Sequence, residues 1–347
     1  MEISAHDDVD GQSSVAQLII SGNYTEKNLK FQEKFGEFTE KTELMLDSYN
    51  LEFPGTIIDH HGSYFDVKNA IENKIAKCKN WNWIPSCTSL GIFQKYQKEI
   101  PKEFFYLHIL GATADGVPHL ISFDIWKKYS FLYKEKMIYP SGAHGTFKQM
   151  KKSIPIIWWL CKFFNTGRYI RNPYKSLDFM LKYDLEDILL SSTNELDAWR
   201  ETIYAVDNSL TSTAMNSIIR KSPNPRIIND VFLWCIKTKI SEKFPPLKIH
   251  SRICSQIFGK KEKLSLNNVK IFIVVNLDSP GEILEASARC DYGIDLVNFL
   301  NNILKKDIGV FHHSTAIGFD IKKSELKNFV LNLQSLKRGK SNEYFKF

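Results

Sequence analysis

The first 120 residues alternate short apolar runs with amphipathic stretches, a pattern that predicts an α/β domain. Glu2–Ala5 fits a short strand that runs into a loop, His6–Gly11. Gln12–Ser21 follows with apolar residues at helical spacing. Leu44–Leu46 and Thr56–Ile58 fit two further buried strands. We therefore expect at least three strands in this part of the chain, each followed by a polar residue or loop.

Helical patterns dominate the next part of the chain. Cys87–Lys98 predicts a helix, and Phe104–Gly116 leads into another loop. Residues 125–205 are rich in aromatic residues and lysines and are predicted to be mostly helical. The apolar run Ile154–Phe164 contains Lys162 and is too short to cross a bilayer. We interpret this run as a buried helix or strand.

The α/β pattern restarts near Arg226 and predicts a second, smaller α/β domain. Its expected strands are Val231–Ile236, Val269–Asn276 and Ala316–Ile321, and its expected helices are Ile249–Phe258 and Gly293–Leu304. The polar segment between the two patterns fits a connection. The expected organisation is a catalytic domain (1–190), a linker (191–225), a substrate-binding domain (226–335) and a basic tail (336–347).

Acidic and histidine residues follow the three predicted strands of the first domain. Asp8 and Asp10 precede Gly11 in a D-x-D-G pattern, and Asp59, His60 and His61 follow the third strand. Loops at the carboxyl ends of parallel strands meet where ligands bind, so these side chains are candidates for one site. An acidic surface turn that caps a helix would show the same D-x-D-G pattern.

Two further aspartates extend this set. Asp47 ends the second predicted strand, and Asp115 lies among small residues in Gly111–Gly116. Either aspartate alone also fits a cap or a turn. Carboxylate oxygens suit Mn²⁺ and Mg²⁺, and imidazole ligands shift the preference toward Mn²⁺ or Zn²⁺. We expect two divalent ions, with Mn²⁺ favoured over Mg²⁺.

Composition adds less than the motifs do. The 347 residues carry a formal net charge of +7, which by itself only weakly favours a polyanionic partner. The six cysteines are scattered and include no C-x-x-C pair, which indicates reduced thiols. The N-terminal segment is acidic and does not fit a secretory signal. Together these features predict a cytoplasmic protein that does not interact with membranes.

In this order, the four motifs resemble the DHH phosphoesterase superfamily, most closely its RecJ-like nuclease and oligoribonuclease branch. The motifs are D-x-D-G at Asp8–Gly11, Asp47, D-H-H at Asp59–His61 and G-x-x-A-D at Gly111–Asp115. Phe163–Arg168 is similar to the N-A-x-G-R segment of RecJ-like proteins. Residues 248–252, 287–289 and 313–319 resemble parts of the DHH-associated C-terminal domain. This chain departs from the family where three glycines usually precede His313, because Val310, Phe311 and His312 occupy those positions.

The resemblance implies a parallel-sheet catalytic domain, a smaller α/β substrate-binding domain and an active site in the cleft between them. It implies that Asp47 bridges two metal ions. His6 and Asp8 would complete the ligands of one ion, and Asp10, His60 and Asp115 those of the other. The catalytic set would be Asp47, Asp59, which orients the histidines, and His61, which contacts the phosphoryl group or leaving group. Substrate phosphates would be held by Arg168, Arg289 and His313.

Some of these residues also have simpler explanations. Arg168 and Arg289 could instead form surface or interdomain salt bridges. His313 could make a structural hydrogen bond at the start of a strand. Trp81 and Trp83 could stack on bases, although packing in the core accounts for them more simply.

The function implied by the resemblance is metal-dependent phosphodiester hydrolysis. The substrate would be single-stranded DNA or RNA or a short oligonucleotide, attacked by a hydroxide that two metal ions activate. One alternative is a phosphodiesterase or phosphatase for a small nucleotide, such as a cyclic dinucleotide or a bisphosphorylated nucleoside. Another is a non-catalytic replication or repair scaffold. The presence of every expected type of metal ligand argues against this last alternative.

Overall fold

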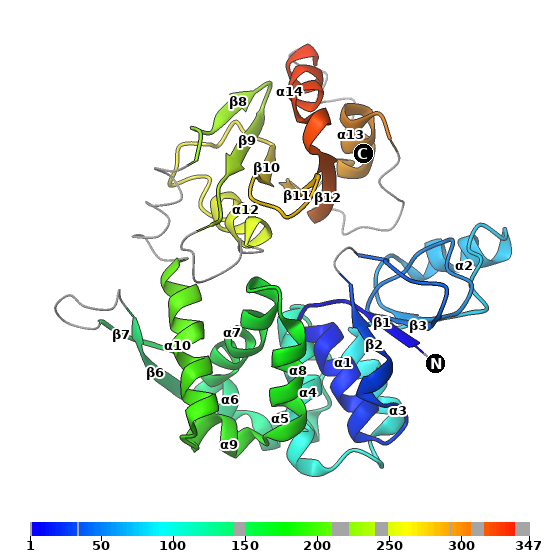
Figure 1. The fold of residues 1–347 in the computed structure, drawn as a ribbon, viewed down its shortest axis with the longest axis vertical. Coiled ribbons are helices and arrows are strands. Elements are labelled where there is room, and N and C mark those ends of the chain that lie inside the picture. The colour runs from blue at the N-terminus through cyan, green and yellow to red at the C-terminus, as the bar shows by residue number, and fades with distance from the viewer. Residues whose placement is uncertain are drawn as a thin grey trace. The chain divides into compact units, whose positions relative to one another are not determined.

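The protein forms two compact units, Met1–Asn208 and Ser209–Phe347, in a computed structural model (Figure 1). The structure describes residues 2–32, 35–141, 150–209, 222–239, 249–291, 293–306 and 316–336.

A five-stranded parallel sheet organises the first unit, with strand order β2-β1-β3-β4-β5. The strands are β1 (Glu2–Ala5), β2 (Leu29–Phe31), β3 (Thr42–Leu46), β4 (Thr56–Asp59) and β5 (Asn80–Trp83). Strands β1, β3 and β4 are almost entirely buried, as expected for parallel strands that are covered on both faces. Figure 1 shows α1 and α2 on opposite sides of this sheet. The predicted α/β class and parallel sheet are confirmed.

Helices make up most of the rest of this unit. They are α1 (Val9–Ile20), α2 (Tyr64–Glu72), α3 (Thr88–Tyr96), α4 (Tyr106–Ala114), α5 (Phe123–Tyr129), α6 (Phe131–Lys134), α7 (Ile156–Tyr169), α8 (Pro173–Lys182), α9 (Leu185–Leu190) and α10 (Asn194–Ser209). Short 3₁₀ turns lie at Glu26–Asn28, Lys102–Phe104 and Pro118–Leu120. The expected loop His6–Gly11 is too long, because α1 already begins at Val9. The Asp8 carboxylate caps it by accepting a 3.1 Å hydrogen bond from Gly11 N.

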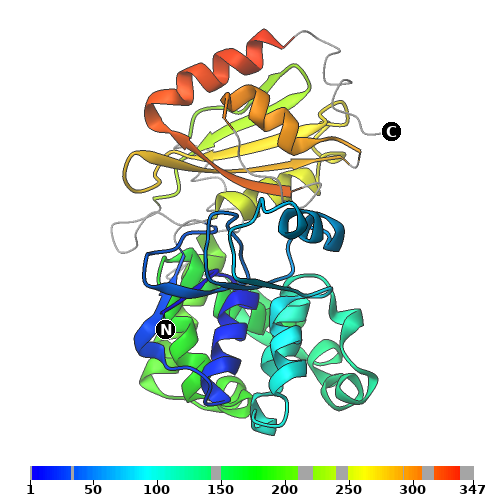
Figure 2. The ribbon, with the colours of Figure 1, turned by 90° about the vertical axis from the view of Figure 1, so that its right-hand side faces the viewer.

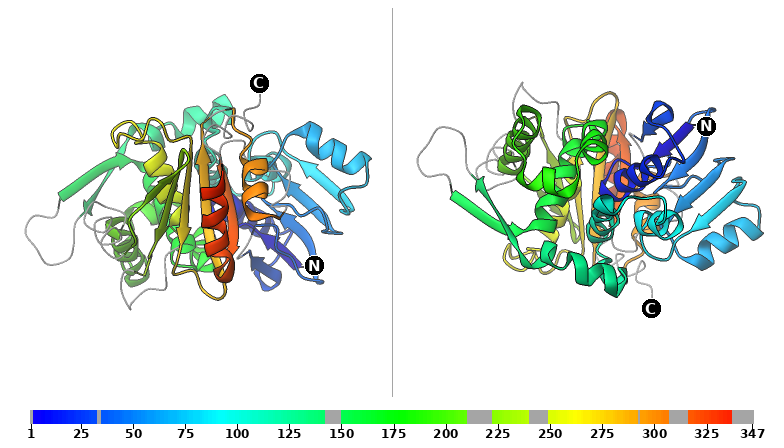
Figure 3. Two further views of the ribbon diagram at one scale, coloured as in Figure 1. Left: turned by 90° about the horizontal axis from the view of Figure 1, so that it is seen from above. Right: turned by 90° about the horizontal axis from the view of Figure 1, so that it is seen from below.

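An antiparallel hairpin interrupts the region that was predicted to be mostly helical. It consists of β6 (Lys136–Ser141) and β7 (Met150–Pro155), which extend away from the helices (Figure 3). Neither strand alternates apolar and polar residues regularly, so the sequence pattern gave no sign of it.

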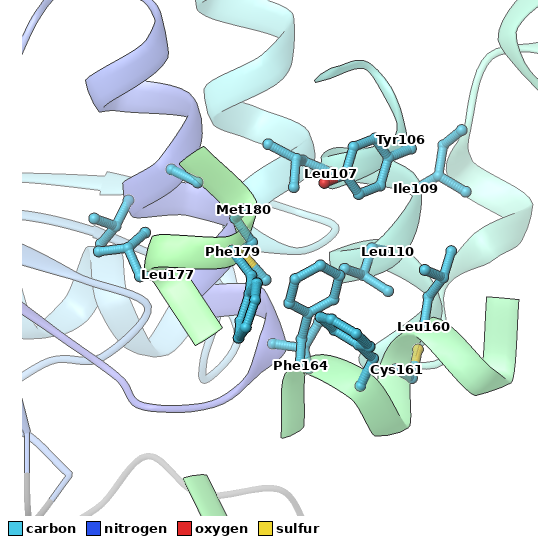
Figure 4. Packing of buried hydrophobic residues seen from close by; sticks show 14 of the residues in the cluster. Tyr106, Leu107, Ile109, Leu110, Leu160, Cys161, Phe164, Leu177, Phe179 and Met180 are labelled. Carbon is cyan, nitrogen blue, oxygen red and sulfur yellow. The ribbon is translucent and has the colours of Figure 1, made fainter. Parts of the chain in front are cut away.

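The core of the helical part lies between α4, α7 and α8 (Figure 4). Leu110, Phe164 and Phe179 are fully buried there, so most of the apolar run Ile154–Phe164, which was predicted to be a buried helix or strand, is a buried helix. Helix α10 joins the same core through Leu196 and Trp199. The first unit therefore continues past residue 190 into the expected linker, while the functional limits of the domains stay a prediction. No helix of the described part is long and apolar enough to span a membrane.

The second unit is built on a mixed sheet with strand order β12-β11-β10-β9-β8. Its elements are β8 (Arg226–Ile228), β9 (Val231–Ile236), α12 (His250–Phe258), β10 (Ile271–Asn276), β11 (Ile283–Cys290), α13 (Leu296–Leu304), β12 (Ala316–Lys322), a 3₁₀ turn (Lys323–Glu325) and α14 (Leu326–Ser335). Figure 2 shows α13 and α14 on one face of the sheet and α12 on the other. The five expected elements are present, whereas β8, β11 and α14 were not predicted.

Candidate metal centre

The carboxyl ends of three neighbouring strands bring the predicted site residues of the first unit together. Strands β1, β3 and β4 are adjacent and parallel, so His6, Asp47 and Asp59 emerge at the same edge of the sheet. Helix α1 begins directly after β1 and adds Asp8 and Asp10 to this edge. The local sequence thus places acidic residues where the loops of a parallel sheet converge.

One group of possible ligand atoms comprises His6, Asp8 and Asp47. His6 Nδ1 lies 3.0 Å from an oxygen of Asp8 and 3.5 Å from Oδ2 of Asp47. Asp47 is buried, and His6 and Asp8 are only slightly exposed.

A second group comprises Asp10, Asp47, His60 and Asp115, whose ligand atoms lie within 4.8 Å of one another. His60 is at its centre. Its Nδ1 lies 3.1 Å from Oδ1 of Asp47 and 3.6 Å from Asp10, and its Nε2 lies 3.2 Å from Asp115. Asp47 belongs to both groups and offers one oxygen to each.

The start of α3 holds two of these carboxylates, a role that the sequence analysis missed. The backbone amides of Thr88 and Ser89 donate to the two oxygens of Asp10 at 2.8 and 3.0 Å. The Thr88 hydroxyl donates to Oδ1 of Asp47 at 2.9 Å and lies 3.2 Å from Nδ1 of His60. Amides at a helix N-terminus stabilise a buried negative charge. Thr88 therefore links three candidate ligands.

The close packing around Asp10 and Ser89 requires a glycine at position 111. A Cβ atom on Gly111 would lie 2.0 Å from the Ser89 hydroxyl and 2.6 Å from Oδ1 of Asp10. Gly111 thus lets α4 approach Asp10 closely and brings Asp115, at the end of that helix, to the cluster.

The backbone at Asp47 has an unusual conformation, with φ at 53° in the left-handed region. Aspartate and asparagine adopt this region more readily than most residues that are not glycine. Such conformations cost free energy and cluster at functional sites. The turn directs the Asp47 carboxylate to a position between His6 and His60.

Asp59 holds His61 at the edge of the cluster. Its carboxylate lies 2.7 Å from Nδ1 of His61 and accepts a 3.1 Å hydrogen bond from the backbone amide of His61. The ring of His61 stacks on that of His60, with the centroids 4.3 Å apart. Asp59 is fully buried, and burial would raise its pKa, but the neighbouring His61 lowers it below the usual value.

Crowding of buried carboxylates shifts the other pKa values strongly. Burial, followed by repulsion from Asp10, holds the pKa of both Asp47 and Asp115 well above the usual range. Burial opposes protonation of His6, but Asp8 and Asp47 outweigh it and raise the pKa of His6 to about 9. The chain's own cations therefore compensate this negative charge only in part.

These residues fit divalent cations. Oδ2 of Asp47 and Oδ2 of Asp115 are buried and accept no hydrogen bond of normal geometry from a described residue. Buried oxygens of this kind are costly unless a cation or a donor faces them. The combination of carboxylate oxygens and imidazole nitrogens suits divalent cations such as Mn²⁺ and Mg²⁺.

Arg168 lies against the first group. Its Nε lies 3.1 Å from the Asp7 carboxylate, and a terminal nitrogen lies 3.7 Å from Asp8. Asp7 was not singled out in the sequence, and it is almost completely buried. Arg168 thus supports the segment between His6 and Asp8, whether or not it also binds a phosphate.

Arg289 belongs to the second unit and lies at the end of β11. It donates to the hydroxyls of Ser255, Ser287 and Ser251 at 3.0–3.1 Å and to the carbonyl of Ala288 at 2.8 Å. Two of these serines lie on α12, so the guanidinium group is fixed between a strand and a helix. His313 and the three positions before it lie outside the described residues.

Solved structures share this fold. RecJ from Thermus thermophilus, in complex with Mg²⁺, aligns with a TM-score of 0.51 at 13% sequence identity. The alignment covers 96% of this chain and 49% of that one, so this chain spans about half the length of that RecJ. The fold is that of RecJ. The expected resemblance to RecJ-like proteins is thereby confirmed at the level of the fold.

Two further structures align with lower scores. An exonuclease RecJ bound to manganese has a TM-score of 0.49 at 12% identity, with 96% of this chain and 89% of that chain covered. The pGpG-specific phosphodiesterase PggH from Vibrio cholerae has a TM-score of 0.42 at 12% identity, with 99% of each chain covered. No protein-family model matches the sequence, and no curated protein is significantly similar to it.

Proposed function

We propose that this chain is a phosphodiesterase that depends on two divalent metal ions and hydrolyses single-stranded nucleic acid or short oligonucleotides. The observation that supports this most directly is the position of Asp47. It is the one carboxylate that belongs to both the His6 group and the His60 group. A bridging carboxylate between two sets of ligands is the arrangement that two-metal hydrolysis requires.

In this proposal, His6 and Asp8 hold one ion, Asp10, His60 and Asp115 hold the other, and Asp47 serves both. Bound Mn²⁺ ions would lower the pKa of water and offset the negative charge that develops on the phosphoryl oxygens. Thr88 fixes the orientation of Asp47 and His60, because its hydroxyl lies between them. Loss of a residue that orients a ligand in this way typically weakens metal binding or activity by roughly 10- to 100-fold.

His61 is proposed to contact the phosphoryl group or the leaving group. Asp59 engages its Nδ1, which directs proton exchange with the substrate to Nε2. The backbone contact from His61 to Asp59 keeps the ring in place while a proton moves. Phosphates farther along the substrate are assigned to Arg289 and His313, with Arg168 acting mainly through Asp7 and Asp8.

Hydrolysis assays test this function directly. The wild-type chain is incubated with Mn²⁺, Mg²⁺ or EDTA and with a single-stranded oligonucleotide, a linear dinucleotide or a cyclic dinucleotide. We expect hydrolysis that requires Mn²⁺ or Mg²⁺ and is fastest on a linear substrate. Preferred turnover of the cyclic dinucleotide would support the small-nucleotide alternative, and a chain that neither binds Mn²⁺ nor hydrolyses any of them would refute the proposal.

A further inference from the structure

Exposed aromatic side chains border the candidate metal centre. The ring of Phe35 lies 4.8 Å from that of His61 and 5.5 Å from that of His6, in edge-to-face geometry. Despite these contacts, 38% of Phe35 remains exposed to solvent. Single exposed apolar side chains are common, but this ring lies directly against two histidines of the cluster, where a substrate bound at the metal centre could pack on it.

A second aromatic group lies next to the His61–Gly62 segment. The indole of Trp83 donates a 3.4 Å hydrogen bond to the carbonyl of Gly62. Its ring lies 5.6 Å from that of Tyr64, the first residue of α2, which is 53% exposed. Phe35 thus packs against the His61 ring, and the Tyr64–Trp83 pair contacts Gly62, the next residue in the chain.

A nearby pair shows what aromatic packing in the core looks like here. Tyr49 and Trp81 stack at 5.4 Å and are both buried. The two tryptophans of β5 therefore differ: Trp81 belongs to the core, while Trp83 is only partly covered. Core packing accounts for the first but not for the exposed rings of Phe35 and Tyr64.

We propose that Phe35, Tyr64 and Trp83 form a stacking surface for the bases of a substrate whose phosphate is bound at the metal centre. This inference rests on the proposed phosphodiesterase function and specifies its substrate class. Every base has a flat face, so aromatic side chains bind bases with little regard to sequence. A stacking surface beside the phosphate site favours nucleotide phosphodiesters over inorganic polyphosphate, which has no ring to stack.

The test compares two substrates that differ only in their bases. These are a linear deoxydinucleotide and its abasic analogue, assayed with Mn²⁺ as the ratio of their kcat/KM values. Phe35→Leu and Tyr64→Leu should each reduce this ratio by roughly five-fold or more, the lower end of what one stacked base contributes. Phe35→Tyr and Tyr64→Phe keep a ring and should retain the ratio. Phe123→Leu is the control, because Phe123 on α5 is a ring that is 76% exposed, more than either tested ring.

Equilibrium binding separates this proposal from the proposed function. Binding of a fluorescently labelled dinucleotide and of the labelled abasic analogue is measured by polarisation in EDTA, where no hydrolysis occurs. Suppose that the wild-type chain shows no metal-dependent hydrolysis but binds the dinucleotide more tightly than the abasic analogue, and that Tyr64→Leu loses this preference. The proposed function then fails and the stacking surface stands. If the Leu variants at Phe35 and Tyr64 bind each ligand as tightly as the variants that keep a ring, the stacking surface is refuted, whatever the hydrolysis assays show.

Discussion

The carboxylate cluster of the first unit and the Arg289 cluster of the second unit differ in the sign of their charge and in the groups that surround it. Around Asp47, several buried carboxylates crowd together. Burial is the main cause that raises the pKa of Asp47 and Asp115, and repulsion between the carboxylates raises it further. In the second unit, the Arg289 guanidinium group donates hydrogen bonds to serine hydroxyls and to a carbonyl, which are neutral groups. The first region concentrates negative charge, whereas the second orients the positive charge of a guanidinium group.

This difference indicates what each region can bind. Buried carboxylates with unsatisfied oxygens are suited to a divalent cation, because the cation relieves the repulsion and supplies the missing contacts. A guanidinium group fixed by hydroxyls keeps its charge and its planar geometry, which suits a phosphate. Removing a residue should therefore abolish chemistry in the first region and weaken binding in the second.

The largest effect is expected at Asp47. Asp47→Asn keeps a residue that tolerates the left-handed backbone, so it removes the charge without adding the strain that Ala would bring. Hydrolysis should fall by more than the roughly 100-fold that is lost when only a supporting residue is removed. Mn²⁺ binding, measured by calorimetry, should weaken at both sites together.

Asp124→Asn provides the control, because Asp124 is an exposed aspartate on α5 outside the cluster. It should retain hydrolysis and metal binding. Folding of both variants is checked by circular dichroism. Normal turnover by folded Asp47→Asn protein would show that the cluster is not a bridged metal centre, and the contrast between the two regions would then disappear.

The next effect is expected at Thr88. Thr88→Val preserves the shape of the side chain but removes the hydroxyl that donates to Asp47. We expect a loss of roughly 10- to 100-fold in Mn²⁺ affinity, which is typical of residues that orient ligands. Thr88→Ser restores the hydroxyl and should recover most of the affinity. Equal affinities for the Val and Ser variants would mean that the hydroxyl does not position the ligands.

Thr88 also shows what the sequence could not reveal about the site. Asp8, Asp10, Asp47 and His60 were predicted because acidic residues and histidines stand out at the ends of predicted strands, and Asp115 because it lies among small residues. Thr88 is an ordinary residue at a helix start, and its contact with Asp10 joins positions 78 apart in the chain. Its backbone amide supplies that contact, and a backbone amide leaves no mark in the sequence. Asp7 was overlooked for a related reason, since its partner Arg168 is distant in the chain.

The fold was predictable where the hydrophobic pattern was strong. β9 matches its predicted bounds, and β10, α12 and α13 were found within a few residues. β11 was missed because Glu285 and Arg289 interrupt its apolar residues and several small residues fill its other positions. The β6–β7 hairpin was missed because its pattern lacks a regular period. Pairing between strands, which no local pattern encodes, defines both elements.

A smaller effect is expected in the second region. Arg289→Ala should raise KM for oligonucleotides by roughly 10- to 100-fold, the range for a lost charged hydrogen bond, with a smaller change in kcat. Arg289→Lys retains the charge without the forked geometry, so its KM should lie between those of the wild-type chain and Arg289→Ala. If kcat falls as much as kcat/KM while KM is unchanged, Arg289 acts in the chemical step, and the proposed division between the two regions is wrong.

The smallest effect concerns stability alone and compares two buried histidines. His6 lies among carboxylates, which outweigh burial and raise its pKa to about 9. His108 is buried on α4, stacked on Phe93 with ring centroids 3.6 Å apart. Neither of its ring nitrogens has a hydrogen-bond partner among the described residues. Burial alone lowers the pKa of His108 to about 3. The pKa of a buried histidine is thus raised where carboxylates surround it, as at His6, and lowered where they do not, as at His108.

Because the folded-state pKa of His108 lies below the unfolded value of about 6.5, the unfolded chain takes up the proton first as the pH falls. Above about pH 6.5, titration of His108 does not lower the free energy of unfolding. As the pH falls from about 6.5 to about 3, the free energy of unfolding decreases. His108→Phe keeps an aromatic ring against Phe93 and removes the titration. Urea unfolding of the EDTA-treated protein at pH 7.5 and pH 5 should show a smaller loss of unfolding free energy for His108→Phe than for the wild-type chain. Equal losses would mean that His108 does not titrate differently in the folded and unfolded states, and that burial has no such effect at this position.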